Sequence, residues 1–288
     1  MHKLIKVDYL FFGFVIITSV LLVSSWSQTE NALSLLLTRG IIVSISVAFI
    51  FFNSILKSAF LHLLRNIYPV LFAGYFYTET VHYNKLFFNN LDQIFIDLDQ
   101  WLFGFQPSIQ FSEYINNSWF TELMYFAYFS FYFIILGFVI AMLFKRKVLF
   151  IESIFKVTFS LLFFYFIFAI FPSAGPQFYF DLPNKSAPTN GYIFQEIMHI
   201  IQENAEQPTG AFPSSHVGVT IVILLLARKK LPLFFNISLP LSILLVLSTV
   251  YIKAHYAVDA IFGLLIAPIV VYLATLVYNF PFKKEPIK

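Results

Sequence analysis

Eight apolar segments dominate the sequence, and their lengths are close to what a helix needs to cross a lipid bilayer. A spanning helix takes about 20 mostly apolar residues, because the hydrocarbon core is about 30 Å thick and each helical residue rises about 1.5 Å. The approximate bounds of the segments are 8–26, 33–56, 63–83, 119–144, 150–171, 213–228, 234–252 and 255–279. The sixth and seventh are short and could extend into their flanks. The segments predict an all-α fold, a polytopic membrane bundle of about eight transmembrane helices.

The composition also points to lipid as the surrounding solvent. Of the 288 residues, 59% are hydrophobic and 11% are charged, whereas soluble domains carry about 25% charged residues. The sequence has no cysteine, which excludes disulfide bonds and thiolate-ligated metals. We therefore expect membrane lipid, and not nucleic acid, as the partner of this chain.

The basic residues predict the orientation of the helices. An even number of spans places both termini on one side, and most basic residues between spans fall on that side. They are Lys3, Lys6, Lys57, Arg65, Lys145, Arg146, Lys147, Arg228, Lys229, Lys230, Lys283 and Lys284. The exceptions are Arg39, Lys85, Lys185 and Lys253. Because cytoplasmic loops carry an excess of Lys and Arg, we expect both termini in the cytoplasm and the other face toward the periplasm, the extracellular space or an organelle lumen.

The spans divide the chain into three parts. We expect two N-terminal transmembrane helices in residues 1–60, a six-helix core in residues 61–280 and a basic cytoplasmic tail in residues 281–288. Two long loops of the core, 84–118 and 172–212, fall on the outer face. The first mixes acidic and apolar residues at helical spacing, which predicts an amphipathic helix on the membrane surface. The second is rich in proline and turn formers, and a loop of this length is usually functional.

Three titratable residues lie where spans begin on the outer face. His216 starts the sixth span, and His255 and Asp259 start the eighth. Ionisable residues in spans are costly and by default mark function, and two helix N-termini together favour an anion such as phosphate. Asp259 is four residues from His255, so it can fix the tautomer of that imidazole and leave its other nitrogen free to attack. His216 would then be the general acid, and the scheme needs no metal and no cofactor.

Simpler explanations exist for each residue taken alone. A histidine near a helix end is more often a structural hydrogen-bonding residue, and Ser214 could be an ordinary helix cap. His255 and Asp259 could stabilise their helix or form one step of a proton relay in a non-enzymatic transporter. The order, spacing and topology of all three residues favour catalysis.

Two short segments carry a family resemblance. Pro213-Ser214-Ser215-His216, followed by Ser248-Thr249-Val250-Tyr251-Ile252-Lys253-Ala254-His255-Tyr256-Ala257-Val258-Asp259, resembles the second and third motifs of the type-2 phosphatidic acid phosphatase superfamily. Those motifs read Pro-Ser-Gly-His and Ser-Arg-x5-His-x3-Asp. The resemblance implies a six-helix core and a phosphohistidine intermediate on His255, with Asp259 orienting the ring and His216 as acid. It also implies that Ser214 hydrogen-bonds the phosphate.

The sequence departs from the family pattern in places. Ser215 replaces a glycine, and Thr249 stands where the third motif has arginine. The first motif, Lys-x6-Arg-Pro, should fall where the chain has the segment from Phe171 to Gln177. That segment resembles the proline-rich form of the inositol-phosphorylceramide and sphingomyelin synthase branch, as do Leu64–Pro69 and the pair His255-Tyr256. In the inositol-type members an arginine often follows the last proline, and here that position holds Gln177.

The missing arginines bear on the substrate. Arginine pairs suit a phosphomonoester dianion, whereas a site with Lys253 as its nearby cation suits a phosphodiester headgroup. This favours a lipid phosphotransferase modestly over a lipid phosphatase, acting on a phospholipid, a sphingolipid or a prenyl phosphate that enters from the bilayer. The alternatives are a phosphomonoester phosphatase of the phosphatidate or prenyl-phosphate type, in which Lys185 could supply the missing charge, and a degenerate member that binds lipid without turnover.

Further residues are expected around the three catalytic ones. The expected phosphate ligands are Ser214, Ser215, Lys253 and Gln177. Residues that could line the substrate pocket are Glu79, His82, Tyr83 and Tyr256. Arg65 is interpreted as an orientation anchor near the cytoplasm, and His199 as part of a solvated surface helix.

Overall fold

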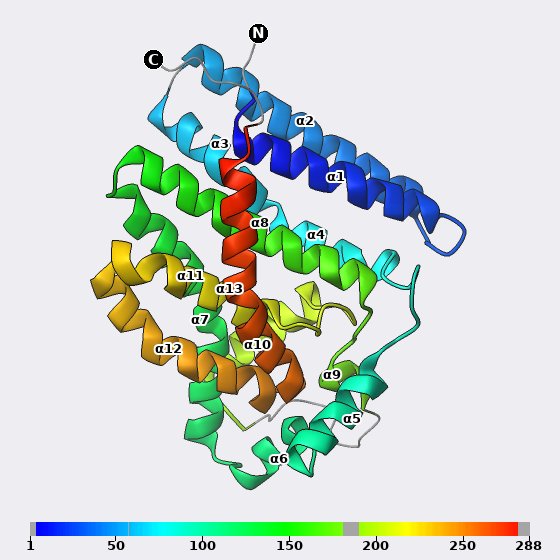
Figure 1. The fold of residues 1–288 in the computed structure, drawn as a ribbon. Coiled ribbons are helices and arrows are strands. Elements are labelled where there is room, and N and C mark those ends of the chain that lie inside the picture. Colours follow the sequence, from blue (N-terminus) through cyan, green and yellow to red (C-terminus); the bar gives the residue numbers. More distant parts are fainter. Residues whose placement is uncertain (1–3, 57, 181–189, 282–288) are drawn as a thin grey trace.

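The structure is a computed structural model that describes residues 4–56, 58–180 and 190–281. All the regular secondary structure of these residues is helical. The helices are α1 Lys6–Ser24, α2 Ala32–Leu56, α3 Ala59–Leu71, α4 Ala73–Glu79, the 3-10 helix η1 Thr80–His82, α5 Asp92–Phe103, α6 Pro107–Tyr114, α7 Ser118–Leu143, α8 Lys147–Ile170, α9 Pro176–Tyr179, α10 Ile193–Ala205, α11 Ser215–Lys230, α12 Pro232–Tyr251 and α13 Ala257–Asn279. They form a helical bundle with the beginning of α1 and the end of α13 at one end and α5 and α6 at the other (Figure 1).

The prediction of a polytopic helical bundle is confirmed. Within the described residues, six helices are long and apolar enough to cross a membrane, namely α1, α2, α7, α8, α12 and α13. The third and sixth predicted spans differ from this pattern. The third is not one continuous helix but is divided at Phe72 into α3 and α4, shortly after Pro69. Proline lacks the backbone N–H of a helical residue, and its ring crowds the preceding turn, but Pro69 itself lies inside α3 and the break follows it.

The sixth predicted span is α11, a helix of 16 residues. It packs against α7, α8, α12 and α13, and most of its residues are buried. Two glycines permit this packing: a Cβ at Gly218 would overlap the ring of Phe164, and one at Gly263 of α13 would lie 2.7 Å from the carbonyl oxygen of Ser214. Small residues let helix backbones approach closely in membranes. This contact brings the beginnings of α11 and α13 together.

The two N-terminal helices are tied to the rest of the bundle by buried ion pairs. Arg39 of α2 pairs with Glu79 of α4 at 2.6 Å, and Arg65 of α3 pairs with Asp8 of α1 at 2.8 Å. Arg65 is thus a buried partner of Asp8 and does not face the interface as an orientation anchor. Breaking a buried ion pair is costly because it leaves the other charge uncompensated.

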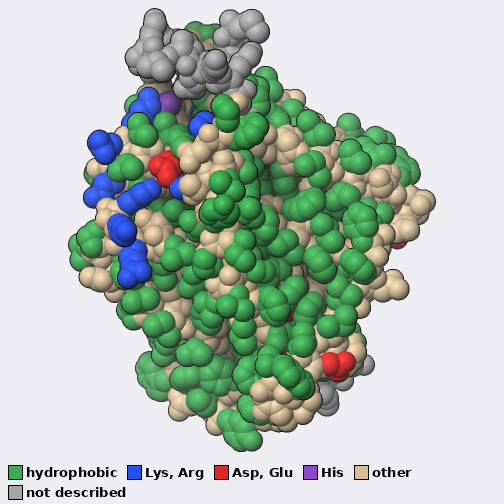
Figure 2. All heavy atoms as spheres, viewed as in Figure 1, with side chains coloured by type: hydrophobic (Ala, Val, Ile, Leu, Met, Phe, Trp, Pro, Cys, Tyr) green, Lys and Arg blue, Asp and Glu red, His purple; other side chains and the backbone are tan. Residues whose placement is uncertain are grey.

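One group of exposed basic residues lies away from α5 and α6. Figure 2 shows one face of the molecule that is largely hydrophobic, with the Lys and Arg side chains in one group at its edge. Lys145, Arg146 and Lys147 are exposed where α7 meets α8, and Arg228 and Lys229 are exposed at the end of α11. Far from this group, α13 contacts α5, and α12 contacts α6 (Figure 1).

Candidate active site

The two segments that resemble family motifs are joined through their backbones. The side chain of Ser214 caps α11 by accepting a hydrogen bond from the Val217 N–H at 3.3 Å. The Ser214 N–H donates to the carbonyl oxygen of Asp259 at 3.0 Å, and the Asp259 carboxylate accepts from the Tyr256 N–H at 2.8 Å. The first turns of α11 and α13 therefore form one unit.

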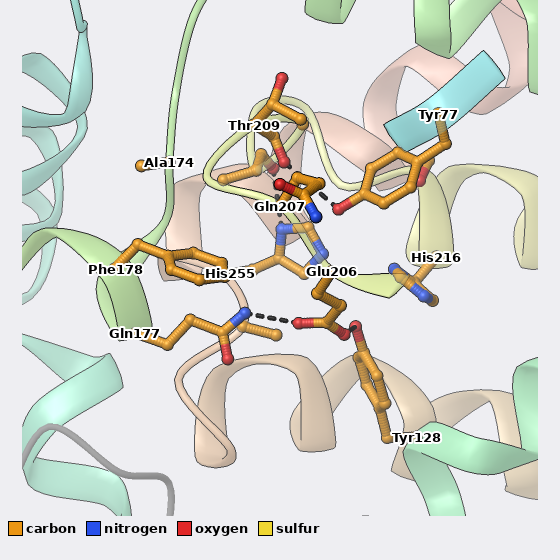
Figure 3. Close-up of a pocket in the computed structure, with 14 residues that line it drawn as sticks. Tyr77, Tyr128, Ala174, Gln177, Phe178, Glu206, Gln207, Thr209, His216 and His255 are labelled. Carbon is orange, nitrogen blue, oxygen red and sulfur yellow. Dashed lines mark hydrogen bonds between the residues drawn. The ribbon is translucent and has the colours of Figure 1, made fainter. Parts of the chain in front are cut away.

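His216 and His255 lie next to each other in this unit. Their ring centroids are 5.7 Å apart, and both line a small cavity of about 20 Å³, room for little more than a water molecule. Figure 3 shows their side chains converging on this space, which we call the histidine cavity. The other lining residues are Tyr77, Tyr128, Ala174, Gln177, Phe178, Glu206, Gln207, Thr209, Gly210, Ala211, Ser215 and Ala254.

His255 is held in one tautomer by a backbone contact. Its Nδ1 lies 2.8 Å from the Ala211 carbonyl oxygen, and because a carbonyl only accepts hydrogen bonds, Nδ1 carries the proton. The Nε2 of the neutral ring then keeps its lone pair. An Asp259 carboxylate oxygen lies 3.7 Å from the same Nδ1, so it flanks the Ala211 hydrogen bond and does not replace it. Burial lowers the pKa of His255 to about 4, so the ring is neutral at pH 7.

His216 is enclosed by aromatic rings. Its ring centroid lies 4.6 Å from that of Tyr128 and 4.5 Å from that of Phe131. The buried Nδ1 of His216 has no hydrogen-bond partner among the described residues. A buried polar atom without a partner is costly in a native structure, so this nitrogen is available to a bound ligand.

The expected phosphate ligands are only partly brought together. Ser215 and Gln177 line the histidine cavity, whereas the Ser214 side chain caps α11. Lys253 has a φ of 63°, and its carbonyl oxygen accepts a hydrogen bond from the Gln177 N–H at 3.0 Å. Its side chain is not among those that line the cavity. Lys185 lies outside the described residues.

None of the four expected pocket residues lines the histidine cavity. Glu79 pairs with Arg39, and Tyr83 is buried against Leu22 and Ala169. His82 is exposed, and Tyr256 donates a hydrogen bond from its hydroxyl to Asp92 at 2.9 Å. His199, expected on a solvated helix, lies on α10 with its Nε2 at 3.1 Å from the Tyr125 hydroxyl.

The N-terminus of α13 is occupied by a carboxylate of the protein itself. Asp99 of α5 accepts hydrogen bonds from the N–H groups of Ala257 and Val258, both at 2.9 Å. Burial raises the pKa of Asp99, while these two hydrogen bonds oppose the shift. The expectation that both helix N-termini face a phosphate is therefore wrong for α13, because Asp99 already satisfies its free N–H groups and its helix dipole.

A second carboxylate of α5 holds the proline-rich segment. Asp92 accepts hydrogen bonds from the Ala174 N–H at 2.7 Å and the Gly175 N–H at 2.8 Å. Gly175 has a φ of 90°, and a Cβ there would lie 2.8 Å from the carbonyl oxygen of Ala254. The segment consequently packs directly against the residues that precede His255.

Comparison with known proteins identifies the family. A family model described as PAP2 superfamily matches residues 93–273, more than half of the 288 residues. The chain belongs to the PAP2 superfamily. A PA-phosphatase related-family protein of Dictyostelium discoideum is 32% identical over 95 residues, which make up 31% of this chain and 17% of that protein. No solved structure matches the chain.

The match to the PAP2 superfamily begins in α5 and ends in α13, so it includes His216, His255 and Asp259. A start of the six-helix core at residue 61 stays a prediction, as does the narrower likeness to the inositol-phosphorylceramide and sphingomyelin synthase branch. The superfamily supports a lipid phosphatase type of enzyme without fixing its substrate.

Glu206 is a cavity residue of this PAP2 superfamily member that the sequence did not reveal. Its carboxylate accepts hydrogen bonds from Gln177 Nε2 at 2.5 Å and the Tyr128 hydroxyl at 3.2 Å (Figure 3). Burial raises the pKa of Glu206, and the hydrogen bonds oppose this shift. In the sequence it is one of several polar residues of a long loop, and no motif spacing connects it with His216.

A larger apolar cavity adjoins the histidine cavity. It has a volume of about 540 Å³ and is lined by residues of α3, α4, α7, α8, α10 and α11. Tyr77, Glu206, Ser215 and His216 line both cavities. Leu71 and Leu136, which also line the apolar cavity, are 59% and 57% exposed. The cavity thus leads from the outer surface of the bundle to His216.

Proposed function

We propose that this PAP2 superfamily member is an integral membrane enzyme that cleaves or transfers the phosphate headgroup of a lipid through a phosphohistidine on His255. The observation that carries the proposal is the pair of imidazoles, with ring centroids 5.7 Å apart, in one cavity. One ring has a fixed tautomer, and the other has an unpartnered buried nitrogen. These are the features that a nucleophile and a general acid require.

In the first step, Nε2 of His255 attacks phosphorus and the bond from phosphorus to the departing alcohol oxygen breaks. Protonated His216 gives its proton to that oxygen, so a neutral alcohol leaves. The phosphorylated ring of His255 keeps its Nδ1 proton and carries a positive charge. The Asp259 carboxylate, 3.7 Å from Nδ1, stabilises this charge.

In the second step, an acceptor oxygen attacks the phosphohistidine and the bond from phosphorus to nitrogen breaks. His216 takes the proton of the acceptor, which returns both histidines to their starting states. Water as the acceptor gives a phosphatase, and a lipid alcohol gives a phosphotransferase. Two features support transfer to a lipid: the apolar cavity reaches His216, and no Lys or Arg is among the described residues that line either cavity.

The position of the site in the bundle supports its place in the membrane. The beginning of α13, to which the beginning of α11 is hydrogen-bonded, lies far from the beginning of α1 and the end of α13 (Figure 1). The exposed basic residues between α7 and α8 and at the end of α11 lie at the opposite ends of these helices. By the positive-inside rule, both termini face the cytoplasm and the histidine cavity faces the periplasm, the extracellular space or a lumen. A lipid headgroup at that interface lies at the depth of the two histidines.

The proposal is tested with purified protein in detergent and phospholipids labelled in the headgroup phosphate. We expect release or transfer of the label, which persists when a chelator is added. A labelled protein that is stable in alkali and labile in acid, as phosphohistidine is, should be trapped after rapid quenching. His255→Ala should abolish both turnover and trapped label.

The matched control is His82→Ala, which removes an exposed imidazole outside the histidine cavity and should leave turnover and trapped label unchanged. Turnover that survives in His255→Ala would overturn the phosphohistidine proposal. If the purified protein carries out proton-coupled transport and does not turn over lipid headgroups, the chain is a transporter and the enzyme proposal is wrong.

A further inference from the structure

The histidine cavity has an unusual charge for a phosphate site. Among the described residues that line it or the apolar cavity, Glu206 is the one Asp, Glu, Lys or Arg side chain. Phosphate sites normally present Arg, Lys or a metal ion to the anion. A carboxylate at this position opposes the binding of any anion.

Glu206 is fixed in place by hydrogen-bond donors. Gln177 Nε2 donates to its carboxylate at 2.5 Å, the Tyr128 hydroxyl at 3.2 Å and Gln202 Nε2 at 3.3 Å. Donors of this kind favour the ionised carboxylate. They hold the carboxylate at the wall of the histidine cavity.

A second observation shows that a ligand belongs beside Glu206. The buried Nδ1 of His216 has no hydrogen-bond partner among the described residues, and His216 lines the same two cavities as Glu206. Figure 3 shows Glu206, His216 and His255 converging on one space. A phosphate that reaches His255 therefore passes close to the Glu206 carboxylate.

We propose that Glu206 is a specificity-determining residue that excludes phosphomonoester dianions and restricts the site to lipid phosphates with one negative charge, the phosphodiesters. This inference rests on the proposed function of the histidine cavity. A phosphomonoester loses its second proton with a pKa of about 6 and is a dianion at pH 8, whereas a diester keeps a single charge. Repulsion by a fixed carboxylate is strong in a buried site, where water screens charges poorly, and it grows with the charge of the ligand. Rejection of the wrong ligand by a like charge is a recognised source of specificity.

The test measures binding at pH 8 to the His255→Ala protein, which cannot turn substrate over. Two lipids with identical acyl chains are compared: phosphatidate, a monoester, and phosphatidylmethanol, which differs by one methyl group on the phosphate. We expect phosphatidylmethanol to bind at least about tenfold more tightly. Glu206→Gln keeps the size and most hydrogen bonds of the side chain. Added to His255→Ala, it should tighten the binding of phosphatidate, so that the affinity ratio of phosphatidylmethanol to phosphatidate falls below about threefold.

The matched control is Glu203→Gln, because Glu203 lies on α10 three residues before Glu206 and is exposed. It should leave the ratio unchanged. Equal affinities for the two lipids in His255→Ala would overturn the inference even if the Glu206 variant does not fold. An unchanged ratio in a folded Glu206→Gln variant would do the same. Absence of turnover in the protein with intact His255 would refute the proposed function. The role of Glu206 is decided separately, by the ratio of the two lipid affinities.

Discussion

The residues of the site differ in which of their polar atoms are already paired. Nδ1 of His255 is held by the Ala211 carbonyl oxygen, so Nε2, the nitrogen proposed as the nucleophile, has one defined state before a substrate binds. Nδ1 of His216 and one carboxylate oxygen of Asp259 are buried and have no partner among the described residues. A ligand that satisfies such atoms gains the hydrogen bonds that the unliganded protein lacks. Of these two atoms, Nδ1 of His216 belongs to a residue that lines the histidine cavity, so it favours binding of a polar group there.

The charge of Asp259 is expected to matter more than its hydrogen bond. Asp259→Asn keeps an oxygen that can accept from the Tyr256 N–H, but it cannot stabilise a positive charge on phosphorylated His255. We expect kcat to fall by about 10²- to 10⁴-fold, the range typical of a lost acid-base or orienting group, with little change in the melting temperature. Steady-state kinetics and thermal unfolding of the same preparation check this. A variant with wild-type kcat would show that the Ala211 contact alone orients His255.

Burial of His255 predicts an acid sensitivity of the fold. Its pKa is lowered from 6.5 to about 4, so between these values the unfolded chain binds a proton that the folded protein does not. The free energy of unfolding should therefore decrease as the pH falls through this window, with a contribution from His255 of up to about 3 kcal/mol. His255→Gln removes this contribution, and its stability should fall less steeply between pH 6.5 and 4. Denaturant unfolding of both proteins in one detergent measures the two slopes, and parallel slopes would contradict the prediction.

The sequence predicted some site residues and missed others for a physical reason. His255 and Asp259 are four residues apart, and the motif spacing relates them to His216. The sequence predicted that they share a helix, whereas His255 precedes the N-cap Tyr256 of α13 and lies 3.7 Å from the Asp259 carboxylate across this capping turn. Asp99 reaches the N–H groups of Ala257 and Val258 from 158 and 159 residues away. Contacts of this kind depend on how α5 lies across the bundle, and neither periodicity nor spacing reports such an arrangement.

At the scale of helices, the site depends on how closely α11 and α13 approach. A Cβ at Gly263 would lie 2.7 Å from the Ser214 carbonyl oxygen and 3.1 Å from Val217 Cβ. Gly263→Ala should therefore force the first turns of the two helices apart, lower stability by about 1–3 kcal/mol and reduce kcat by moving His216 relative to Asp259. Unfolding and turnover measurements test both effects.

Gly13 of α1 provides the matched control for this change. A Cβ at Gly13 would meet no atom within 4 Å, and alanine is the better helix former by about 1 kcal/mol. Gly13→Ala should be neutral or slightly stabilising, with unchanged turnover. A Gly263→Ala protein that behaved like Gly13→Ala would show that the approach of α11 and α13 is not needed to position the site.

The sequence predicted which segments form helices better than it predicted where a helix is interrupted. Long apolar segments predicted α1, α2, α7, α8, α12 and α13 because lipid demands uninterrupted apolar helices. The third span was predicted as one helix from the apolar length of residues 63–83, which include Pro69. Here α12 and α13 continue through Pro240 and Pro268, while α3 ends two residues after Pro69. Packing against neighbouring elements decides whether a helix continues beyond a proline or ends near it, and local composition does not reveal this packing.

At the scale of the whole molecule, two buried ion pairs join the N-terminal helices to the remainder of the bundle. They link α2 to α4 through Arg39 and Glu79, and α1 to α3 through Asp8 and Arg65. The match to the PAP2 superfamily begins at residue 93, so these helices lie outside the matched part. Their ion pairs contact α3 and α4, which also line the apolar cavity. The N-terminal helices therefore support one wall of that cavity.

The orientation of the molecule in the membrane can be tested directly because the chain has no cysteine. Helix α7 has 26 residues and extends about 39 Å at 1.5 Å per residue, which exceeds the roughly 30 Å of a hydrocarbon core. Tyr114, which is 81% exposed, precedes this helix on the side of the histidine cavity, and Lys145 is exposed beyond its other end. Single cysteines at these two positions thus report on opposite sides of the membrane.

Tyr114→Cys should react with a membrane-impermeant maleimide applied to intact cells or sealed vesicles of the correct orientation. Lys145→Cys should react only after permeabilisation, because the positive-inside rule predicts that the basic end of the bundle faces the cytoplasm. The unmodified protein supplies the background in both assays, and turnover of each variant confirms that it is folded. The reverse labelling pattern would place the histidine cavity on the cytoplasmic side and its lipid substrate in the inner leaflet. Labelling of both cysteines from one side would show that α7 does not cross the membrane.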